Sequence, residues 1–283
     1  MNDQSRRDFL KIAGIAAAVS SAPLTTALAG SEGLQKKEKS PVLFDLGIAS
    51  YTFLSFTLDQ TIEMTKRLGI KKLTLKDMHL PLKSTEKEIK TALEKIKNAG
   101  LQLMSCGVIY MKTEEELKQA FAYAKMAEIK MIIGAPDQKL LNVAERYVKE
   151  NDIAIAIHNH GPNDERYPSP ESAYRLIEKM DKRMGLCIDI GHTQRLGLDP
   201  SVEAERFFDR LLDVHFKDVD ASEAKGATIE IGRGVIDIPK FLKTMIKLNY
   251  SRTLHYEFEK DPKDPLAGVA ESVGYARGVL AAL

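Results

Sequence analysis

Ile153-Ala-Ile-Ala-Ile-His-Asn-His160 is the stretch that decides the fold, an apolar run that ends in clustered histidines. The same shape returns at Leu186-Cys-Ile-Asp-Ile-Gly-His192, Leu211-Leu-Asp-Val-His-Phe-Lys-Asp218 and Thr253-Leu-His-Tyr-Glu-Phe-Glu259. Each run is short and rich in Ile, Val or Leu, and a helix with its turns fits between neighbouring runs, as in a repeated βα unit. Polar residues of metal-ligand type at the carboxyl ends of parallel strands are typical of the catalytic mouth of a barrel.

Strand and helix patterns alternate from Val42 onward without a break in composition. Strand patterns occupy residues 43–52, 72–76, 101–108, 131–134, 153–158, 184–189, 212–216 and 253–258. Helical patterns follow them at residues 58–68, 85–99, 113–127, 140–150, 170–179, 200–210, 238–248 and 265–283. Strict alternation means a parallel sheet, and eight units favour closure of that sheet. We therefore predict a single (β/α)8 TIM barrel over residues 42–283, with no second domain.

The first 29 residues are predicted to be an export leader rather than part of the fold. Arg6-Arg7 precede an apolar run, and Ala27-Leu28-Ala29 matches a small-residue cleavage site. The run is broken by Gly14 and Pro23 and is too short to span a bilayer, so stable membrane insertion of the mature chain is not expected. The paired arginines resemble a twin-arginine export signal, which implies a bacterial periplasmic location. Residues 30–41 are polar and are predicted to be a flexible linker.

The charge balance argues against a nucleic-acid partner. The sequence has 41 Lys and Arg against 40 Asp and Glu, a formal net charge of +1, so no strongly basic surface is implied. Cys106 and Cys187 lie in apolar runs and are predicted to be buried core thiols. The oligomeric state is left open.

Alternation along the strands predicts which side chains face the barrel axis. The bulky isoleucines of the first run should meet the helices, which turns His158 inward. The same alternation sends Asp189, His215 and Glu257 inward on the following strands. Four polar groups therefore converge on one side of the mouth and suit one divalent ion, Mn, Zn, Co or Fe better than Mg. The alternative is a set of charged pairs and capped histidines that closes the barrel end.

Further polar residues are candidates for contacts to a substrate or to the cluster. His160 and His192 end their runs and can orient a substrate or support the ligands. Lys76 and Lys217 point inward and can stabilise an oxyanion, or bridge to neighbouring carboxylates instead. Other candidates are His79 in a loop near the mouth, and Glu259, which faces in with Glu257. His255 is interpreted as a buried, hydrogen-bonded histidine.

One loop offers a weaker signal. Gly232-Arg-Gly234 has the glycines of a backbone cradle for an anion. A short Gly-x-Gly is weak evidence, and a plain turn is the default.

At these residues the chain resembles the xylose isomerase-like TIM-barrel superfamily, and within it the sugar phosphate isomerases/epimerases. The likeness runs from about Val42 to the C-terminus and is carried by residues 157–160, 188–192, 214–218, 232–237 and 256–259. The resemblance implies one metal held by Glu, Asp, His and Glu on four strands, with the two glutamates as acid and base. Asp189, His215 and Glu257 match that pattern, whereas His158 stands in place of the first glutamate.

The resemblance implies a carbohydrate substrate and a proton abstracted next to a carbonyl. Glu257 is then the carboxylate base, with His160, Lys217 or a water on the metal as its partner. The first hypothesis is a metal-dependent isomerase or epimerase of a free sugar or sugar derivative, since export argues against a sugar phosphate. The second is a metal-dependent lyase or hydratase on a keto-sugar or modified glycoside. A non-catalytic carbohydrate-binding barrel is the third, and a DNA-repair endonuclease is a distant fourth.

Overall fold

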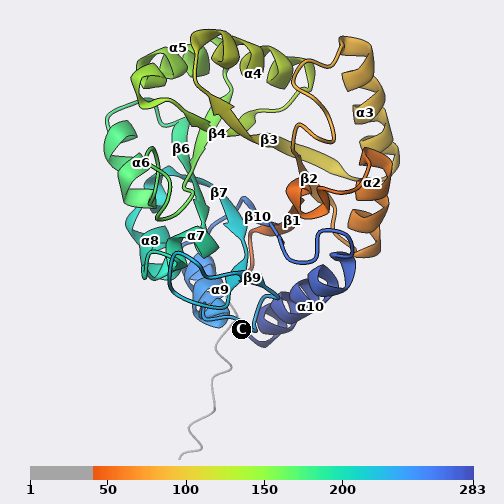
Figure 1. The fold of residues 1–283 in the computed structure, drawn as a ribbon, viewed down its shortest axis with the longest axis vertical. Coiled ribbons are helices and arrows are strands. Elements are labelled where there is room, and N and C mark those ends of the chain that lie inside the picture. Colours follow the sequence, from red (N-terminus) through yellow and green to blue (C-terminus); the bar gives the residue numbers. More distant parts are fainter. Residues whose placement is uncertain (1–40) are drawn as a thin grey trace, which may run out of the picture. The chain divides into compact units, whose positions relative to one another are not determined.

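Eight parallel strands close into a barrel in the computed structural model, which describes residues 41–283. The strands are β1 Asp45–Ala49, β2 Lys72–Leu75, β3 Gln102–Met111, β4 Met131–Pro136, β5 Ala154–His158, β6 Met184–Asp189, β7 Leu211–Phe216 and β10 Thr253–Tyr256. Their order around the barrel is β1-β10-β7-β6-β5-β4-β3-β2, so β1 pairs with both β2 and β10 (Figure 1). The predicted TIM barrel is confirmed.

Helices form an outer ring around the strands (Figure 1). They are α2 Leu58–Arg67, α3 Glu86–Asn98, α4 Glu114–Met126, α5 Leu141–Asn151, α6 Pro170–Ile177, α8 Pro200–Arg206, α9 Ile238–Lys247 and α10 Leu266–Ala282. Each corresponds to a predicted helix. The predicted leader and most of the predicted linker lie outside the described residues, and the division of the chain at Val42 stays a prediction.

Several predicted elements were too long, and a 3-10 helix takes up the difference at two of them. β1 ends at Ala49 because Ser50–Phe53 turn into the 3-10 helix η1. The last strand, β10, ends at Tyr256 rather than at residue 258, and α8 ends at Arg206 before the 3-10 helix η3, Phe208–Arg210. Elements that the sequence did not predict are α7 Ile190–Gln194, the 3-10 helix η2 Gln138–Leu140, and the strand pair β8 Asp218–Val219 and β9 Thr228–Ile229.

Local sequence explains where the helices begin and end. Thr57, Thr85 and Ser169 each close a capping box with the residue three positions on, which satisfies amide groups that a helix leaves unpaired at its start. Gly69 and Gly100 follow the ends of α2 and α3 with φ of +64° and +73°, a left-handed conformation that glycine adopts without steric cost. These signals fix the βα boundaries without help from the core.

The core has an outer and an inner part. The larger cluster lies between strands and helices and includes Ile155, Ile157, Ile188 and Phe216. A smaller cluster fills the barrel interior and consists of Val108, Ile133, Ala156, Cys187 and Leu212, with Met131 and Ala154 packed against it. In β5 the isoleucines therefore face the helices and the alanines face the axis, as the alternation predicts. Both cysteines are free and buried, which confirms their prediction as core thiols.

Within residues 41–283, none of the helices combines the length and the apolar character that a membrane crossing requires.

Arg210 ties the end of α6 to the start of β7. Its side chain is 1% exposed, and its guanidinium donates to the backbone carbonyls of Glu178, Met180, Asp181 and Met184 at 2.6–2.9 Å. These carbonyls lie in the connection between α6 and β6, where backbone groups lack a ladder partner. One buried cation thus satisfies four acceptors.

We expect Arg210→Met to lower the free energy of unfolding by about 3 kcal/mol, because it leaves buried carbonyls without donors. Arg175→Met is the matched control, since Arg175 is 74% exposed and pairs only with Glu171 at the surface. The control should cost less than about 1 kcal/mol. Urea unfolding of both variants measures the difference, and equal losses would contradict the bridging role of Arg210.

Candidate functional site

Four side chains converge at the carboxyl ends of neighbouring strands: His158, Asp189, His215 and Glu257. His158 ends β5, Asp189 ends β6, His215 lies in β7, and Glu257 follows β10. Asp189 is in register with His215, and the other two sit at the same level because the strands of a barrel are staggered. All four are buried, and one potential ligand atom from each lies within 4.8 Å of the others. The structure therefore brings together the predicted cluster, whose role as a metal site stays a prediction.

The facing atoms are close enough to share one ion. His158 Nε2 lies 2.9 Å from His215 Nδ1 and 3.4 Å from Asp189 Oδ2, and His215 Nδ1 lies 3.1 Å from Glu257 Oε2. Asp189 Oδ1 accepts the backbone N–H of His192 and so caps α7. Asp189 Oδ2 is buried and has no hydrogen-bond partner among the described residues. Two imidazoles and two carboxylates fit a transition-metal ion better than Mg²⁺.

Lys217 is the cation beneath this cluster. Its Nζ lies 2.7 Å from Glu257 Oε2, 2.7 Å from Glu259 Oε1 and 3.0 Å from Asp189 Oδ2, although the last contact lacks hydrogen-bond geometry. Burial alone would lower the pKa of Lys217, but the three carboxylates raise that pKa well above its usual value. Three carboxylates still face one ammonium, so the site carries surplus negative charge that a further cation would offset.

The same electrostatics keep the two cluster carboxylates ionised. Burial raises the pKa of Asp189, yet Lys217 and the neighbouring histidines outweigh burial and hold that pKa well below its usual range. Burial likewise raises the pKa of Glu257, and His215 and Lys217 together lower it well below normal. Both side chains are therefore carboxylates at neutral pH.

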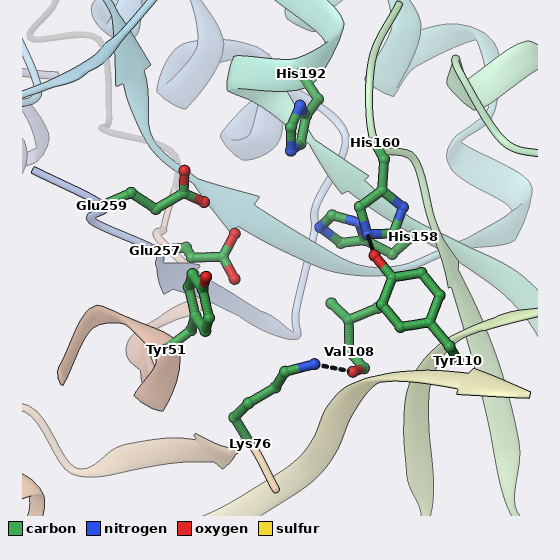
Figure 2. A pocket seen from close by; sticks show the side chains of 9 residues that line it. All are labelled: Tyr51, Lys76, Val108, Tyr110, His158, His160, His192, Glu257 and Glu259. Atoms are coloured by element: carbon green, nitrogen blue, oxygen red, sulfur yellow. Dashed lines mark hydrogen bonds between the residues drawn. The ribbon is translucent and has the colours of Figure 1, made fainter. Parts of the chain in front are cut away.

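A pocket of about 310 Å³ opens above the cluster (Figure 2). This volume is at the low end of the range for small-molecule sites. Its lining residues are Tyr51, Lys76, Val108, Tyr110, His158, His160, His192, Glu257 and Glu259. Two members of the cluster, His158 and Glu257, thus line the pocket. The other predicted site residues that line it are Lys76, His160, His192 and Glu259. Lys217, Asp189 and His215 are not among its lining residues and are 0–1% exposed.

Apart from Lys217, which contacts the cluster from beneath, His79 is the one predicted site residue outside the pocket and the cluster. It is buried beneath η1, with Nδ1 2.9 Å from Ser50 Oγ and Nε2 3.2 Å from the carbonyl oxygen of Phe53. These contacts show that His79 holds η1, the turn that carries Tyr51, rather than lining the pocket. His255 is buried below the cluster, 2.8 Å from Asp213 Oδ1 and 3.3 Å from Thr74 Oγ1, as its interpretation as a hydrogen-bonded histidine requires.

Two tyrosines that the sequence did not predict as site residues line the pocket. Tyr51 lies in η1, inside a stretch predicted to be strand, and Tyr110 lies beyond the predicted end of the third strand. Both follow the carboxyl ends of apolar runs, the position that marked the histidines and acids. That position was the available signal, and it went unused because tyrosine is not a metal-ligand type here.

The two pocket histidines have defined partners. His160 Nε2 lies 2.9 Å from the hydroxyl of Tyr110, and its Nδ1 lies 3.4 Å from Asp164 Oδ2. Burial lowers the pKa of His160 to about 4, so the ring is neutral at physiological pH. His192 Nδ1 lies 3.1 Å from the guanidinium of Arg195, which can only donate. Nδ1 therefore accepts, and Nε2 of the neutral ring carries the proton that can be donated.

The Gly232–Gly234 loop is wrapped around an acid of the chain itself. Asp218 Oδ2 accepts from the amides of Gly232 at 2.9 Å and Gly234 at 3.1 Å, and Oδ1 accepts from Ile236 at 3.2 Å. A carboxylate thus already occupies the place of an external anion. The loop is a turn anchored by Asp218, in line with the default interpretation.

Gly191 provides the room that Lys217 needs. A Cβ at position 191 would lie 2.5 Å from Lys217 Cγ and 2.7 Å from Lys217 Cδ. We expect Gly191→Ala to displace the lysine stem and to lower the free energy of unfolding by about 1–3 kcal/mol.

The matched control is Gly274→Ala, because Gly274 is also helical but a Cβ at that position would meet nothing within 4 Å. It should be neutral or stabilising by up to about 1 kcal/mol, as alanine is the better helix former. Chemical denaturation of the two variants measures the difference in their free energies of unfolding. A Gly191→Ala variant as stable as Gly274→Ala would show that Lys217 adapts without cost.

Comparison with known proteins places this barrel in a family. The rhizopine catabolism protein MocC of Rhizobium meliloti is 31% identical over 142 residues, which are 44% of this chain and 42% of that protein. An inosose dehydratase of Clostridium tetani is 27% identical over 140 residues, 44% of this chain and 46% of that protein. The matches thus span less than half the length of these curated relatives.

Solved structures share the whole fold. The 3-keto-D-glucoside 4-epimerase YcjR of E. coli superposes with a TM-score of 0.68 at 14% identity, covering 83% of this chain and 99% of that chain. At this identity the likeness shows the fold alone. The sequence profile of the xylose isomerase-like TIM barrel matches residues 138–279, half of the chain. The chain therefore belongs to the xylose isomerase-like TIM-barrel family.

Proposed function

We propose that the chain is a divalent-metal-dependent enzyme that isomerises or epimerises a free sugar or sugar derivative. Its chemistry is removal of a proton from the carbon next to a carbonyl. The observation that carries the proposal is the position of Glu257, which lines the pocket and completes a buried cluster of two histidines and two carboxylates. The family supports an enzyme with a small carbohydrate substrate.

His158, Asp189, His215 and Glu257 would hold the metal. Their donor set favours Mn²⁺, Co²⁺, Fe²⁺ or Zn²⁺ over Mg²⁺, because nitrogen ligands suit these ions. A divalent ion bound there would supply Lewis-acid polarisation of a carbonyl or of neighbouring hydroxyls. Asp189 Oδ2, which has ion-pair contacts but no hydrogen bond, and the surplus of carboxylates over Lys217 support an additional cation at this position.

Residues that line the pocket would transfer the proton and bind the substrate. Glu257 is the proposed base, and since His215 and Lys217 contact its Oε2, Oε1 is left for the substrate proton. His192 would donate from Nε2 to a substrate oxygen, because Arg195 occupies the other ring nitrogen. Glu259 would accept from a substrate hydroxyl. The polar lining and small volume suit a monosaccharide with several hydroxyl groups.

A dehydratase or lyase on a keto-sugar is the second candidate. His158 takes the place of the first glutamate that the family resemblance implies, so the second carboxylate base of that pattern is missing. The other acid of the pocket, Glu259, is held by Lys217 and lies on the same side as Glu257 (Figure 2). Chemistry with one base suits elimination next to a carbonyl, and one relative carries the name inosose dehydratase. A periplasmic location, part of the proposal, would exclude sugar phosphates from the substrates.

Metal-binding measurements test whether the cluster holds a divalent ion. After chelation and re-addition of Mn²⁺ or Co²⁺, we expect the protein to bind one equivalent. Asp189→Asn and His215→Ala should each weaken binding at least about 10-fold, since each removes a donor. Equilibrium dialysis measures the affinity.

His79→Gln is the control for metal binding, because His79 is also a buried histidine but bonds to Ser50 and Phe53 away from the cluster. It should bind metal like the unaltered protein. Unchanged affinity in both cluster variants would refute the site.

Proton exchange tests whether the protein removes the proton next to a sugar carbonyl. In heavy water, with a panel of free and 3-keto sugars, we expect deuterium to enter the carbon next to the carbonyl. Glu257→Gln should slow this exchange by about 100- to 10,000-fold, the usual contribution of a general base. Mass spectrometry follows the label, and metal content is measured on the same samples.

Glu271→Gln is the matched control, because Glu271 is an exposed residue that pairs with Arg233 at the surface. It should exchange normally. A protein that binds sugars without metal or exchange would instead be a non-catalytic carbohydrate-binding barrel. Product mass separates the two catalytic candidates, since only elimination loses water.

A further inference from the structure

We propose that Tyr110 is the second proton-transfer group, acting from the wall of the pocket opposite Glu257. The inference rests on the proposed function. It assigns to a tyrosine on β3 the task of returning a proton to the face of the substrate carbon opposite the face that Glu257 deprotonates.

The position of Tyr110 carries this inference. Its side chain lines the pocket and is 42% exposed, so a substrate can reach the hydroxyl. Figure 2 shows Tyr110 on the His160 side of the pocket, with Glu257, Glu259 and Tyr51 on the other side. A reaction that moves a proton between two faces needs a group on each side. The described pocket offers one on each.

The alternatives on the Tyr110 side are already engaged. His158 belongs to the cluster, where its Nε2 faces His215 and Asp189. His160 Nε2 is bonded to the hydroxyl of Tyr110 itself. Lys217 is held by three carboxylates and does not line the pocket. The hydroxyl of Tyr110 is thus the acidic O–H presented from that wall.

Two cations lie near the ring of Tyr110, while its surroundings on balance keep the hydroxyl protonated. The guanidinium carbon of Arg166 lies 4.8 Å from the ring centroid, and Lys76 Nζ lies 5.8 Å from it. These two cations stabilise negative charge on a phenolate. Burial and the nearby Asp164 raise the pKa of Tyr110, so the hydroxyl is protonated before reaction.

His160 fixes the direction of that hydroxyl. Besides the 2.9 Å bond to it, the imidazole stacks on the phenol with centroids 5.4 Å apart and planes at 25°. Asp164 stands 3.4 Å behind His160 Nδ1, and its other oxygen accepts the backbone N–H groups of Arg166 and Tyr167. The tyrosine is therefore positioned by a chain of groups anchored in the β5–α6 loop.

The proposed step balances in protons and electrons. Glu257 takes the proton next to the carbonyl, and the electron pair of the broken C–H bond becomes the double bond of an enediolate. That pair then forms a new C–H bond on the opposite face with the proton of the Tyr110 hydroxyl, whose own electron pair stays on the phenolate. The proton on Glu257 returns to the phenolate through water.

Tyr110→Phe in heavy water tests the step, with a sugar that the unaltered enzyme converts. We expect conversion to fall about 100-fold or more, because the opposite face receives no proton. Deuterium should still enter the recovered substrate, since Glu257 can exchange its proton with solvent and return it to the same face. The ring remains, so the fold and the metal content should be unchanged, as circular dichroism and metal analysis will check.

Tyr275→Phe is the control, because Tyr275 lies on the surface in α10, outside the pocket. It should convert and exchange normally. Normal conversion by Tyr110→Phe, or loss of exchange together with conversion in a folded variant, would overturn the role of Tyr110 while leaving the proposed function in place. Absence of exchange in the unaltered, metal-loaded enzyme on every sugar would overturn the proposed function and this inference with it.

Discussion

The buried ammonium of Lys217 is the interaction on which the mouth of the barrel depends. Burying Asp189 and Glu257 without a partner would cost several kcal/mol each and would drive protons onto them. Lys217 contacts both carboxylates and Glu259, so it keeps the cluster charged before anything binds. Its place follows from two features of the sequence: alternation turns it inward from the end of β7, and Gly191 leaves space for its stem. The position of Lys217 thus depends on packing against Gly191 and on its ion pairs with three carboxylates.

Strand alternation made much of the cluster predictable from sequence. The isoleucines of β5 and Val214 and Phe216 of β7 face the helices, so polar side chains at the strand ends have one direction left. A closed barrel then forces inward residues of neighbouring strands together, whatever their identity. Asp189 and His215 lie in register without an irregularity between them. The sequence reasoning succeeded because the pairing is regular over the last residues of these strands, from Cys187↔Asp213 to Asp189↔His215.

The same alternation would have failed in β3, where the backbone departs from that period. Ser105 faces the interior, where its hydroxyl meets Thr74, so strict alternation would turn Gly107 and Ile109 inward as well. The register between β3 and β4 shifts between Cys106 and Ile109, and Val108 and Tyr110 line the pocket instead. A shift of one residue exchanges the two faces of a strand, and composition does not reveal where the shift occurs. Tyr51 escaped prediction for a related reason, because η1 replaces the last residues of the expected strand.

The imidazole at position 158 fits the charges around it. Under the proposed function, the three carboxylates of Asp189, Glu257 and Glu259 face one ammonium and one divalent ion, so positive and negative charges are equal. A glutamate in place of His158 would add a fourth carboxylate, a buried one, and leave one negative charge without a partner, at a cost that burial makes large. Lys217 and a neutral ligand at position 158 are therefore two parts of one electrostatic solution. That solution gives up the second carboxylate base, and a proton donor such as Tyr110 must then come from a different wall of the pocket.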